Sequence, residues 1–178
     1  MRNSTLQKIG IVSDTHGVLH SKLIESLEGV DWIIHAGDVG DVSILEALRA
    51  IAPVSAVRGN HDRGMEFADL PEHDFISIGE DSYAYVLHDL KEIQFDPWAG
   101  RCELVVSGHT HIPSCFVDRG VIFLNPGSAG IRRESEHMLT CAILVRVEPT
   151  WMVRFVDLEN SEKSECNSIS VQRSKKDT

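Results

Sequence analysis

The first third of the chain alternates short apolar runs with helical segments, and this alternation limits the folds that it can adopt. Runs 8–12, 31–35 and 53–57 are rich in β-branched residues and have the length of buried strands. Between them, segments 21–29 and 42–52 carry apolar residues at helical spacing. Such strand–helix–strand units build parallel sheets with helices packed on their faces. The N-terminal third therefore predicts an α/β arrangement.

The remainder of the 178-residue chain is mostly strand. Runs 103–107 and 121–124 predict further buried strands, and 75–87 is typical of a hairpin around a Gly-Glu-Asp-Ser turn. Segments 138–147 and 151–158 predict a closing hairpin. We expect one α/β (α+β) domain over residues 1–158, built as a mixed sheet or as two sheets flanked by helices. The polar segment 159–178 lacks apolar periodicity and is expected to be a disordered tail.

Composition excludes several classes of protein. The net charge of -10 argues against stable nucleic-acid binding through a broad basic surface. The four cysteines form no C-x-x-C pair, which is typical of reduced thiols rather than of a disulfide framework. No apolar run approaches the roughly 20 residues that a membrane span needs, and the N-terminus lacks the features of a signal peptide. These features predict a cytoplasmic protein that does not bind membranes.

Polar clusters follow the predicted strands at their carboxyl ends. They are 13–16, 35–38 and 59–62 after the early strands, and 88–89 and 108–111 after later ones. Ligands of α/β sheets bind beyond the carboxyl ends of the strands, so we expect these clusters to converge on one crevice.

The donors in these clusters suit divalent metal ions. Carboxylate, imidazole and amide groups without a thiolate favour manganese, iron, nickel, zinc or magnesium, and manganese is our first expectation. The eight candidate donors are Asp14, His16, Asp38, Asn60, His61, His88, His109 and His111. Eight donors exceed one tetrahedral site and suit two ions about 3.5–4 Å apart, as in two-metal phosphatases and nucleases.

The ordered motifs D-x-H, G-D, G-N-H-D, a lone His and G-H-x-H resemble the calcineurin-like metallophosphoesterase superfamily. The resemblance runs from Ile9 to about Ser128 and is nearest to the small, single-domain, phosphodiesterase-like branch. The segment 124–130, "LNPGSAG", also resembles a turn of that branch. The resemblance implies a sandwich of two mixed β-sheets flanked by helices.

The resemblance also implies a role for each matching residue. Asp14, His16 and His111 would hold the first metal, and Asp38 would bridge both ions. Asn60, His88 and His109 would complete the second. The catalytic residues would be His61, as proton donor to the leaving oxygen, and Asp41, as the carboxylate that orients it. Arg58 and Asn60 would contact the substrate phosphate.

Other positions leave alternatives open. Asp89 follows His88 where the family usually has Gly, and it could brace an imidazole, crowd the second metal or point to solvent. Asp41 could instead cap the following helix. His35 lies within an apolar strand and is expected to pack there or to support a ligand. Asp62 could hold its loop, and His73 is a rival to His88.

The expected function is a dinuclear-metal-dependent phosphodiesterase in which a metal-bridging hydroxide attacks phosphorus and His61 acts as general acid. Two divalent ions, two carboxylates and one hydroxide leave a net charge of about +1, which matches a monoanionic diester. The alternatives are a phosphomonoesterase or nucleotide phosphatase at the same site, or a non-catalytic scaffold like the related retromer subunit. The expected partner is a small phosphate ester, and small relatives often form homo-oligomers.

Overall fold

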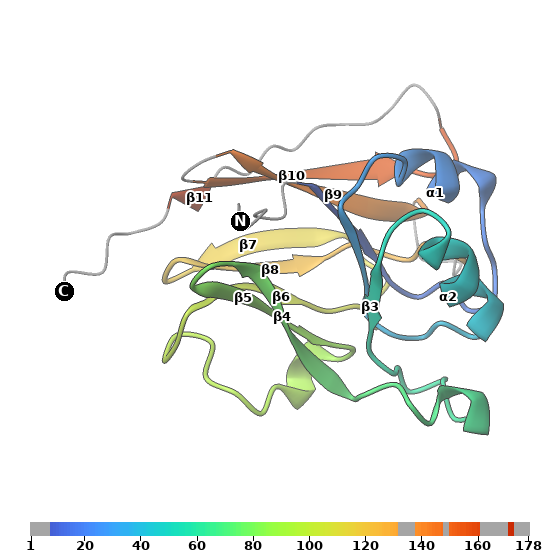
Figure 1. Ribbon diagram of the computed structural model, residues 1–178, viewed down its shortest axis with the longest axis horizontal. Helices are drawn as coiled ribbons and strands as arrows, with labels where there is room; N and C mark the ends of the chain where they lie inside the picture. The colour runs from blue at the N-terminus through green and yellow to red at the C-terminus, as the bar shows by residue number, and fades with distance from the viewer. Residues whose placement is uncertain (1–7, 132–137, 148–149, 161–170, 173–178) are drawn as a thin grey trace.

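The computed structural model describes residues 8–131, 138–147, 150–160 and 171–172, and it forms two stacked mixed β-sheets (Figure 1). The first sheet has the order β11-β10-β9-β1-β2-β3. Its strands are β1 (Lys8–Val12), β2 (Trp32–His35), β3 (Val54–Ala56), β9 (Thr140–Val147), β10 (Thr150–Asp157) and β11 (Val171–Gln172). β1 pairs in parallel with β2 and antiparallel with β9. The sheet is therefore mixed, as expected.

The second sheet has the order β4-β5-β6-β8-β7. Its strands are β4 (His73–Gly79), β5 (Ser82–Leu87), β6 (Cys102–Val106), β7 (Ser114–Asp118) and β8 (Val121–Asn125). β5, β6 and β8 run parallel, and β4 and β7 pair antiparallel at the two edges. Two mixed sheets with few helices confirm the predicted α/β sandwich. The edge strand β7, whose side chains are mostly exposed, is an addition to the predicted elements.

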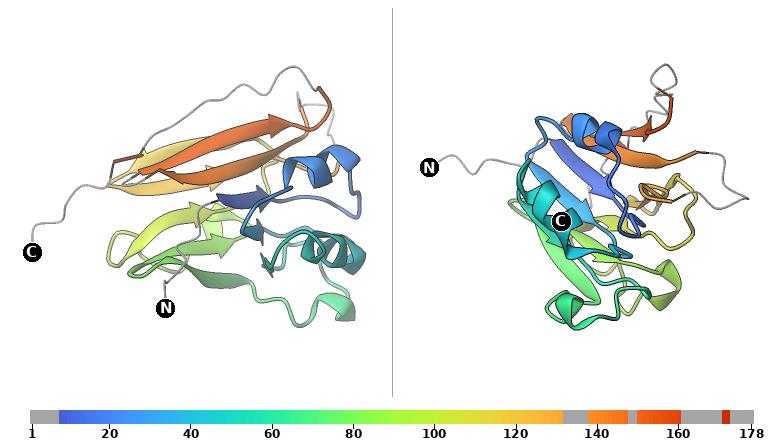
Figure 2. Two further views of the ribbon diagram at one scale, coloured as in Figure 1. Left: turned by 45° about the horizontal axis from the view of Figure 1, so that its top comes forward. Right: turned by 90° about the vertical axis from the view of Figure 1, so that its right-hand side faces the viewer.

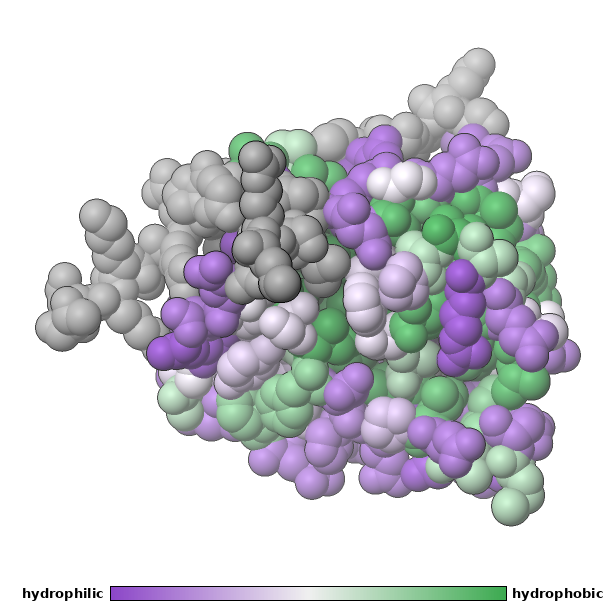
Figure 3. All heavy atoms as spheres, viewed as in Figure 1, coloured by the Kyte–Doolittle hydropathy of each residue, from purple (hydrophilic) through white to green (hydrophobic). Residues whose placement is uncertain are grey.

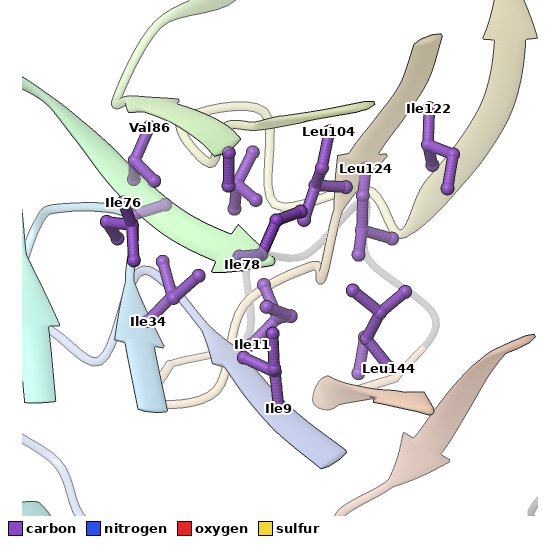
Figure 4. Packing of buried hydrophobic residues seen from close by; sticks show 14 of the residues in the cluster. Ile9, Ile11, Ile34, Ile76, Ile78, Val86, Leu104, Ile122, Leu124 and Leu144 are labelled. Atoms are coloured by element: carbon purple, nitrogen blue, oxygen red, sulfur yellow. The ribbon is translucent and has the colours of Figure 1, made fainter. Parts of the chain in front are cut away.

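The main hydrophobic core lies between the two sheets (Figure 4). Ile9, Ile11 and Ile34 of the first sheet face Leu104 and Leu124 of the second, and all five are fully buried or nearly so. Side chains alternate between the faces of a strand, so Val12 and Ile33 point to the opposite face of the first sheet. β1, β2, β9 and β10 therefore contribute to both cores.

The second core joins the first sheet to its two helices, α1 (Ser21–Ser26) and α2 (Val42–Arg49). Leu23, Leu45 and Leu48 pack from these helices against the sheet. A Cβ atom at Gly10 would overlap the side chain of Leu27, so glycine allows the α1 segment to approach β1 closely. Both helices are shorter than their predicted segments.

The outer face of the second sheet is covered by the segment 88–101, which contains the short 3-10 helix η2 (Leu90–Glu92). Phe95 and Trp98 from this segment pack against Tyr85, Val105 and Phe123 of the sheet. Another 3-10 helix, η1 (Met65–Phe67), follows the loop after β3. Neither of these short helices was predicted, because three residues are too few to show a helical period.

No helix in the described ranges is long and apolar enough to cross a membrane. On the face shown in Figure 3, hydrophilic and hydrophobic side chains are interspersed. Of the predicted tail 159–178, Val171–Gln172 pair with β10 as β11, while 161–170 and 173–178 lie outside the described residues. Disorder of the tail stays a prediction.

Truncating the inter-sheet core should destabilise the fold. Leu104 is fully buried between the sheets, so Leu104→Ala is expected to lower the free energy of unfolding by about 2–5 kcal/mol. The control is Met152→Ala on β10, where the side chain is 39% exposed and the expected change is about 0.5 kcal/mol or less. Urea denaturation measures both. Equal stabilities of the two variants would contradict this account of the core.

Candidate metal centre

The turns that follow β1 and β2 are joined by backbone hydrogen bonds. The N–H of Asp14 donates to the carbonyl of Gly37 at 3.0 Å, and that of His16 donates to the carbonyl of Asp38 at 3.0 Å. In the second sheet, the N–H of Gly108 donates to the carbonyl of His88 at 2.9 Å. Figure 2 shows α1 and α2 at one end of the stacked sheets. The polar clusters converge there, as the sequence predicts.

The backbone of these turns adopts an unusual conformation. Among the described residues, six other than glycine have positive φ, and five of them are candidate metal ligands. They are Asp14 (φ 54°), His16 (46°), Asp38 (53°), His109 (67°) and His111 (61°). Left-handed backbone is disfavoured for residues with a Cβ atom, and where it persists it often marks a functional site. The fold therefore holds these side chains in place against a local conformational cost.

Two groups of side chains lie close enough to hold metal ions. The first is Asp14, His16 and His111, and the second is Asp14, Asp38 and His88. Nε2 of His111 lies 3.3 Å from Oδ1 of Asp14, and Nε2 of His88 lies 3.3 Å from Oδ2 of Asp38. Asp14 belongs to both groups. The family resemblance implies that Asp38 bridges the two ions. In the structure Asp14 also lies close to the donors of both groups.

A divalent cation fits the first group. Asp14 is fully buried, and its Oδ1 has no hydrogen-bond donor among the residues that the structure describes. A buried carboxylate oxygen without such a partner is costly unless a cation compensates its charge. The Nε2 atoms of His16 and His111 are 3.1 Å apart. Two nitrogen ligands at about 2.1 Å from one ion, at a right angle to each other, would be separated by about 3 Å.

The second group has a ligand whose tautomer is fixed. Nδ1 of His88 lies 2.7 Å from the carbonyl oxygen of Ala36, which can only accept, so Nδ1 carries the proton. In the neutral ring Nε2 therefore keeps its lone pair for a metal, and it lies 3.1 Å from Oδ1 of Asn60. Nδ1 of His109 is also 3.1 Å from that oxygen. Asn60, His88 and His109 therefore converge on one point, and their role as ligands of a second metal stays a prediction.

Hydrogen bonds and nearby charges keep the carboxylate of Asp38 ionised. Burial alone raises the pKa of Asp38, but hydrogen bonds from His88 and the N–H of His61, with the charges of nearby imidazoles, lower it to about 2. Burial lowers the pKa of His16. For His88 burial acts in the same direction, but the hydrogen bond and charge of Asp38 outweigh it and raise the pKa. Asp38 is therefore an anion at neutral pH and attracts cations.

The loop after β3 is held by Asp62, whose role the sequence leaves open. Its buried carboxylate accepts hydrogen bonds from the N–H groups of Val39 (3.0 Å), Gly40 (2.9 Å) and Gly59 (2.9 Å). It thereby joins the loop after β3 to the loop after β2. The N–H of His61 donates to Oδ1 of Asp38 at 2.8 Å. This network places Asn60 and His61 beside the candidate ligands.

His61 is the most accessible imidazole beside the two groups, with 58% of its side chain exposed. Its Nε2 lies 4.0 Å from Oδ2 of Asp38, and its ring centre lies 5.4 Å from that of His16. His35, in contrast, is buried, and its Nε2 lies 2.9 Å from Oγ1 of Thr15. Thr15 donates in turn to the carbonyl of Val39, so His35 supports the turn between Asp14 and His16.

Several predicted roles have other contacts in the structure. Asp41 caps α2 by accepting from the N–H of Ser43 at 2.8 Å, and in the described part of the chain no hydrogen bond links it to His61. Arg58 pairs with Glu72 at 2.8 Å. His73 lies on β4, where its ring contacts that of Tyr85, and it belongs to neither group of candidate ligands. The orienting role of Asp41 and the phosphate contact of Arg58 stay predictions.

The "LNPGSAG" segment supports the site from behind. Asn125 donates to the carbonyl of Gly108 at 2.6 Å and to Oγ1 of Thr110 at 3.1 Å, beside His109 and His111. The hydroxyl of Ser128 lies 3.0 Å from the carbonyl of Asp14. The sequence resemblance singles out this turn but gives it no task. Its polar side chains form hydrogen bonds with the loops after β1 and β6, which are distant in the sequence. Only the folded structure reveals these contacts.

Comparison with known proteins identifies the family. The model described as the calcineurin-like phosphoesterase superfamily domain matches residues 8–148. The chain belongs to this superfamily. A probable metallophosphoesterase of Methanocaldococcus jannaschii is 34% identical over 139 residues, which cover 70% of this chain and 69% of that protein. Membership in the calcineurin-like superfamily, together with this relative, indicates a metal-dependent phosphoesterase.

Solved structures share the calcineurin-like fold. A predicted phosphoesterase from Streptococcus pneumoniae superposes with a TM-score of 0.67 at 24% identity, covering 92% of this chain and 97% of that one. Vacuolar Protein Sorting 29 from Cryptosporidium parvum superposes with a TM-score of 0.75 at 20% identity, with coverage of 92% and 97%. At these identities the likeness establishes the fold alone. The predicted two-sheet sandwich is confirmed.

A side chain at Gly59, where the loop after β3 contacts the loop after β2, should abolish metal binding. A Cβ atom at Gly59 would overlap the backbone nitrogen and the carboxylate of Asp38, so Gly59→Ala is expected to displace Asp38 and abolish stoichiometric binding of Mn²⁺. Gly29→Ala is the control, because Gly29 has a positive φ but open space around it. It should lose stability and keep its metal. Equilibrium dialysis would contradict this account if Gly59→Ala retained normal binding.

Proposed function

We propose that the protein is a dinuclear-metal-dependent phosphodiesterase acting on small phosphate esters. The observation that carries the proposal is the convergence of two buried carboxylates, Asp14 and Asp38, with imidazole donors on either side. Asp14, His16 and His111 would hold one ion, and Asn60, His88 and His109 the other, with Asp38 between them. Carboxylate, imidazole and amide donors suit Mn²⁺ first among Mn, Ni, Fe, Zn and Mg.

The ions, when bound, would act as Lewis acids on the phosphate oxygens and supply a nucleophilic water at neutral pH. The residues of the chain then set the charge of the site. Asp14 and Asp38 offset part of the cationic charge, and Asn60 is a neutral donor that leaves the remainder in place. Asp89 adds a carboxylate 3.6 Å from His109. Its negative charge disfavours a dianionic monoester relative to a monoanionic diester.

His61 would protonate the leaving oxygen. Its N–H is anchored to Oδ1 of Asp38, which fixes the backbone, while its ring is half exposed and free to meet the ester oxygen of a substrate. A positioned general acid contributes about 10²–10⁴-fold to the rate. The contribution grows as the leaving alkoxide becomes more basic and needs the proton more.

Replacing the proton donor should separate good from poor leaving groups. His61→Ala is expected to slow hydrolysis of an alkyl diester by about 10²–10⁴-fold and to have a much smaller effect on a p-nitrophenyl diester. Mn²⁺ stoichiometry should stay at the wild-type value, because His61 is assigned no ligand role. Steady-state rates on both substrates measure the effect. An equal loss on the two diesters would exclude His61 as the general acid.

Replacing the shared carboxylate should remove the metal itself. Asp38→Asn takes away the anion that lies 3.3 Å from Nε2 of His88, and we expect loss of bound metal together with loss of activity. Elemental analysis of the purified variant measures this. Retention of two ions with full activity would exclude Asp38 as the bridging ligand.

Two other functions remain as alternatives. A phosphomonoesterase or nucleotide phosphatase would use the same donors, and rates of the Mn²⁺ form on a monoester and a diester, measured side by side, distinguish them. The fold shared with Vacuolar Protein Sorting 29 is the observation that supports the second alternative, a non-catalytic scaffold. Against it, all seven proposed ligand positions carry side chains able to bind metal. Purified protein that bound no divalent metal would support the scaffold.

A further inference from the structure

Asp89 occupies a position between η2 and the candidate metal centre. It is the N-cap of η2, where its Oδ1 accepts a hydrogen bond from the N–H of Lys91 at 3.0 Å. Its other oxygen, Oδ2, lies 3.6 Å from Nε2 of His109. Because the cap fixes one carboxylate oxygen, the second is held facing the imidazole. Of the alternatives that the sequence leaves open, the structure therefore places Asp89 beside an imidazole, and it is that of His109 and not of the adjacent His88.

The ring of His109 has a different partner at each nitrogen. Nδ1 faces Oδ1 of Asn60 at 3.1 Å, on the side where Asn60, His88 and His109 converge, while Nε2 faces Asp89 on the opposite side. The backbone of His109 is also fixed, since its N–H donates to Oδ2 of Asp14 at 3.1 Å. With its side chain 39% exposed, His109 is less confined by packing than His88, whose side chain is 5% exposed. Orientation of this ring depends on its polar partners.

We propose that Asp89 is a positioning residue that orients His109 and selects its metal-binding tautomer. A carboxylate opposite Nε2 favours the proton on that nitrogen, which leaves the Nδ1 lone pair facing the Asn60 side. His88 has the equivalent support from the carbonyl of Ala36. His88 and His109, the two imidazoles of the proposed second metal site, thus each have a supporting partner on the side away from Asn60: a backbone carbonyl for His88 and a carboxylate for His109. The inference rests on the proposed dinuclear centre.

The test compares Mn²⁺ binding by the full-length wild type, Asp89→Ala and Asp89→Asn. We expect two ions in the wild type, with affinity for the second lowered by about 10–100-fold in both variants, as for other partners of metal-binding histidines. Affinity for the first ion, held by Asp14, His16 and His111, should not change. In electron paramagnetic resonance, the spin-coupled pair of Mn²⁺ ions should give way to a mononuclear signal.

Two further variants separate positioning from charge and folding. Glu92→Gln removes the same charge from the exposed end of η2 and should bind both ions as the wild type does. Asp89→Glu retains the carboxylate and should recover part of the affinity for the second ion. Thermal unfolding of the metal-free proteins checks that each variant folds. In Asp89→Asn the amide oxygen can still cap η2, but the amide group no longer favours one tautomer of His109. This variant therefore tests the contact with His109 separately from the cap of η2.

The results distinguish failure of this inference from failure of the proposed function. A wild type that binds fewer than two ions would overturn the dinuclear centre and the role of Asp89 with it. A wild type with two ions, together with unchanged affinity for the second ion in both Asp89→Ala and Asp89→Asn, would overturn the role of Asp89 alone. Equal weakening of both ions would also overturn it, because a positioning role through His109 predicts an effect on one site.

Discussion

The buried carboxylate of Asp14 is the constraint on which the candidate metal centre depends. The residue lies at the carboxyl end of β1, fully buried and with positive φ, and one of its oxygens has no hydrogen-bond donor in the described part of the structure. Burying such a group is unfavourable unless a cation balances it. The surrounding turns supply the imidazoles of His16 and His111, whose Nε2 atoms are 3.1 Å apart and could bind the same ion. Charge compensation by a bound metal would offset the cost of burying this carboxylate.

The two sheets supply the rigidity that this strain requires. β1 and β2 are parallel neighbours, so their carboxyl ends place Asp14 and Asp38 in adjacent turns that are joined by backbone hydrogen bonds. The second sheet brings His88, His109 and His111 to the same place from β5 and β6. Packing of Ile9, Ile11 and Leu104 between the sheets holds the halves of the site together. Stability of the core and geometry of the site are thus linked.

The sequence predicts much of this arrangement because apolar runs and polar strand ends are local patterns. The strands of the N-terminal third and the hairpin around residue 80 follow from spacing alone. Spacing does not predict how Asp14 and His16 meet, because both have positive φ and not the extended backbone of a strand. β7 and the two 3-10 helices do not, because they are short and mostly exposed. The choice of Ser43 as the partner of Asp41 reflects a local helix cap that competes with a distant imidazole.

Contacts between distant loops are beyond what the sequence can predict. Asp62 accepts three backbone hydrogen bonds, and two of them come from a loop more than 20 residues away. Asn125 donates to the carbonyl of Gly108, and Asp89 lies 3.6 Å from the imidazole of His109, which are also contacts between segments distant in the sequence. Each is a polar residue with several plausible local roles, and only the three-dimensional pairing decides between them. The candidate metal ligands are therefore more predictable than the residues that hold them in place.

The most direct test of this account is anomalous X-ray diffraction from crystals of the protein loaded with Mn²⁺. The account predicts two anomalous peaks, one among Asp14, His16 and His111 and the other among Asn60, His88 and His109, with Asp38 between them. A single peak, or peaks that lie away from these side chains, would contradict it.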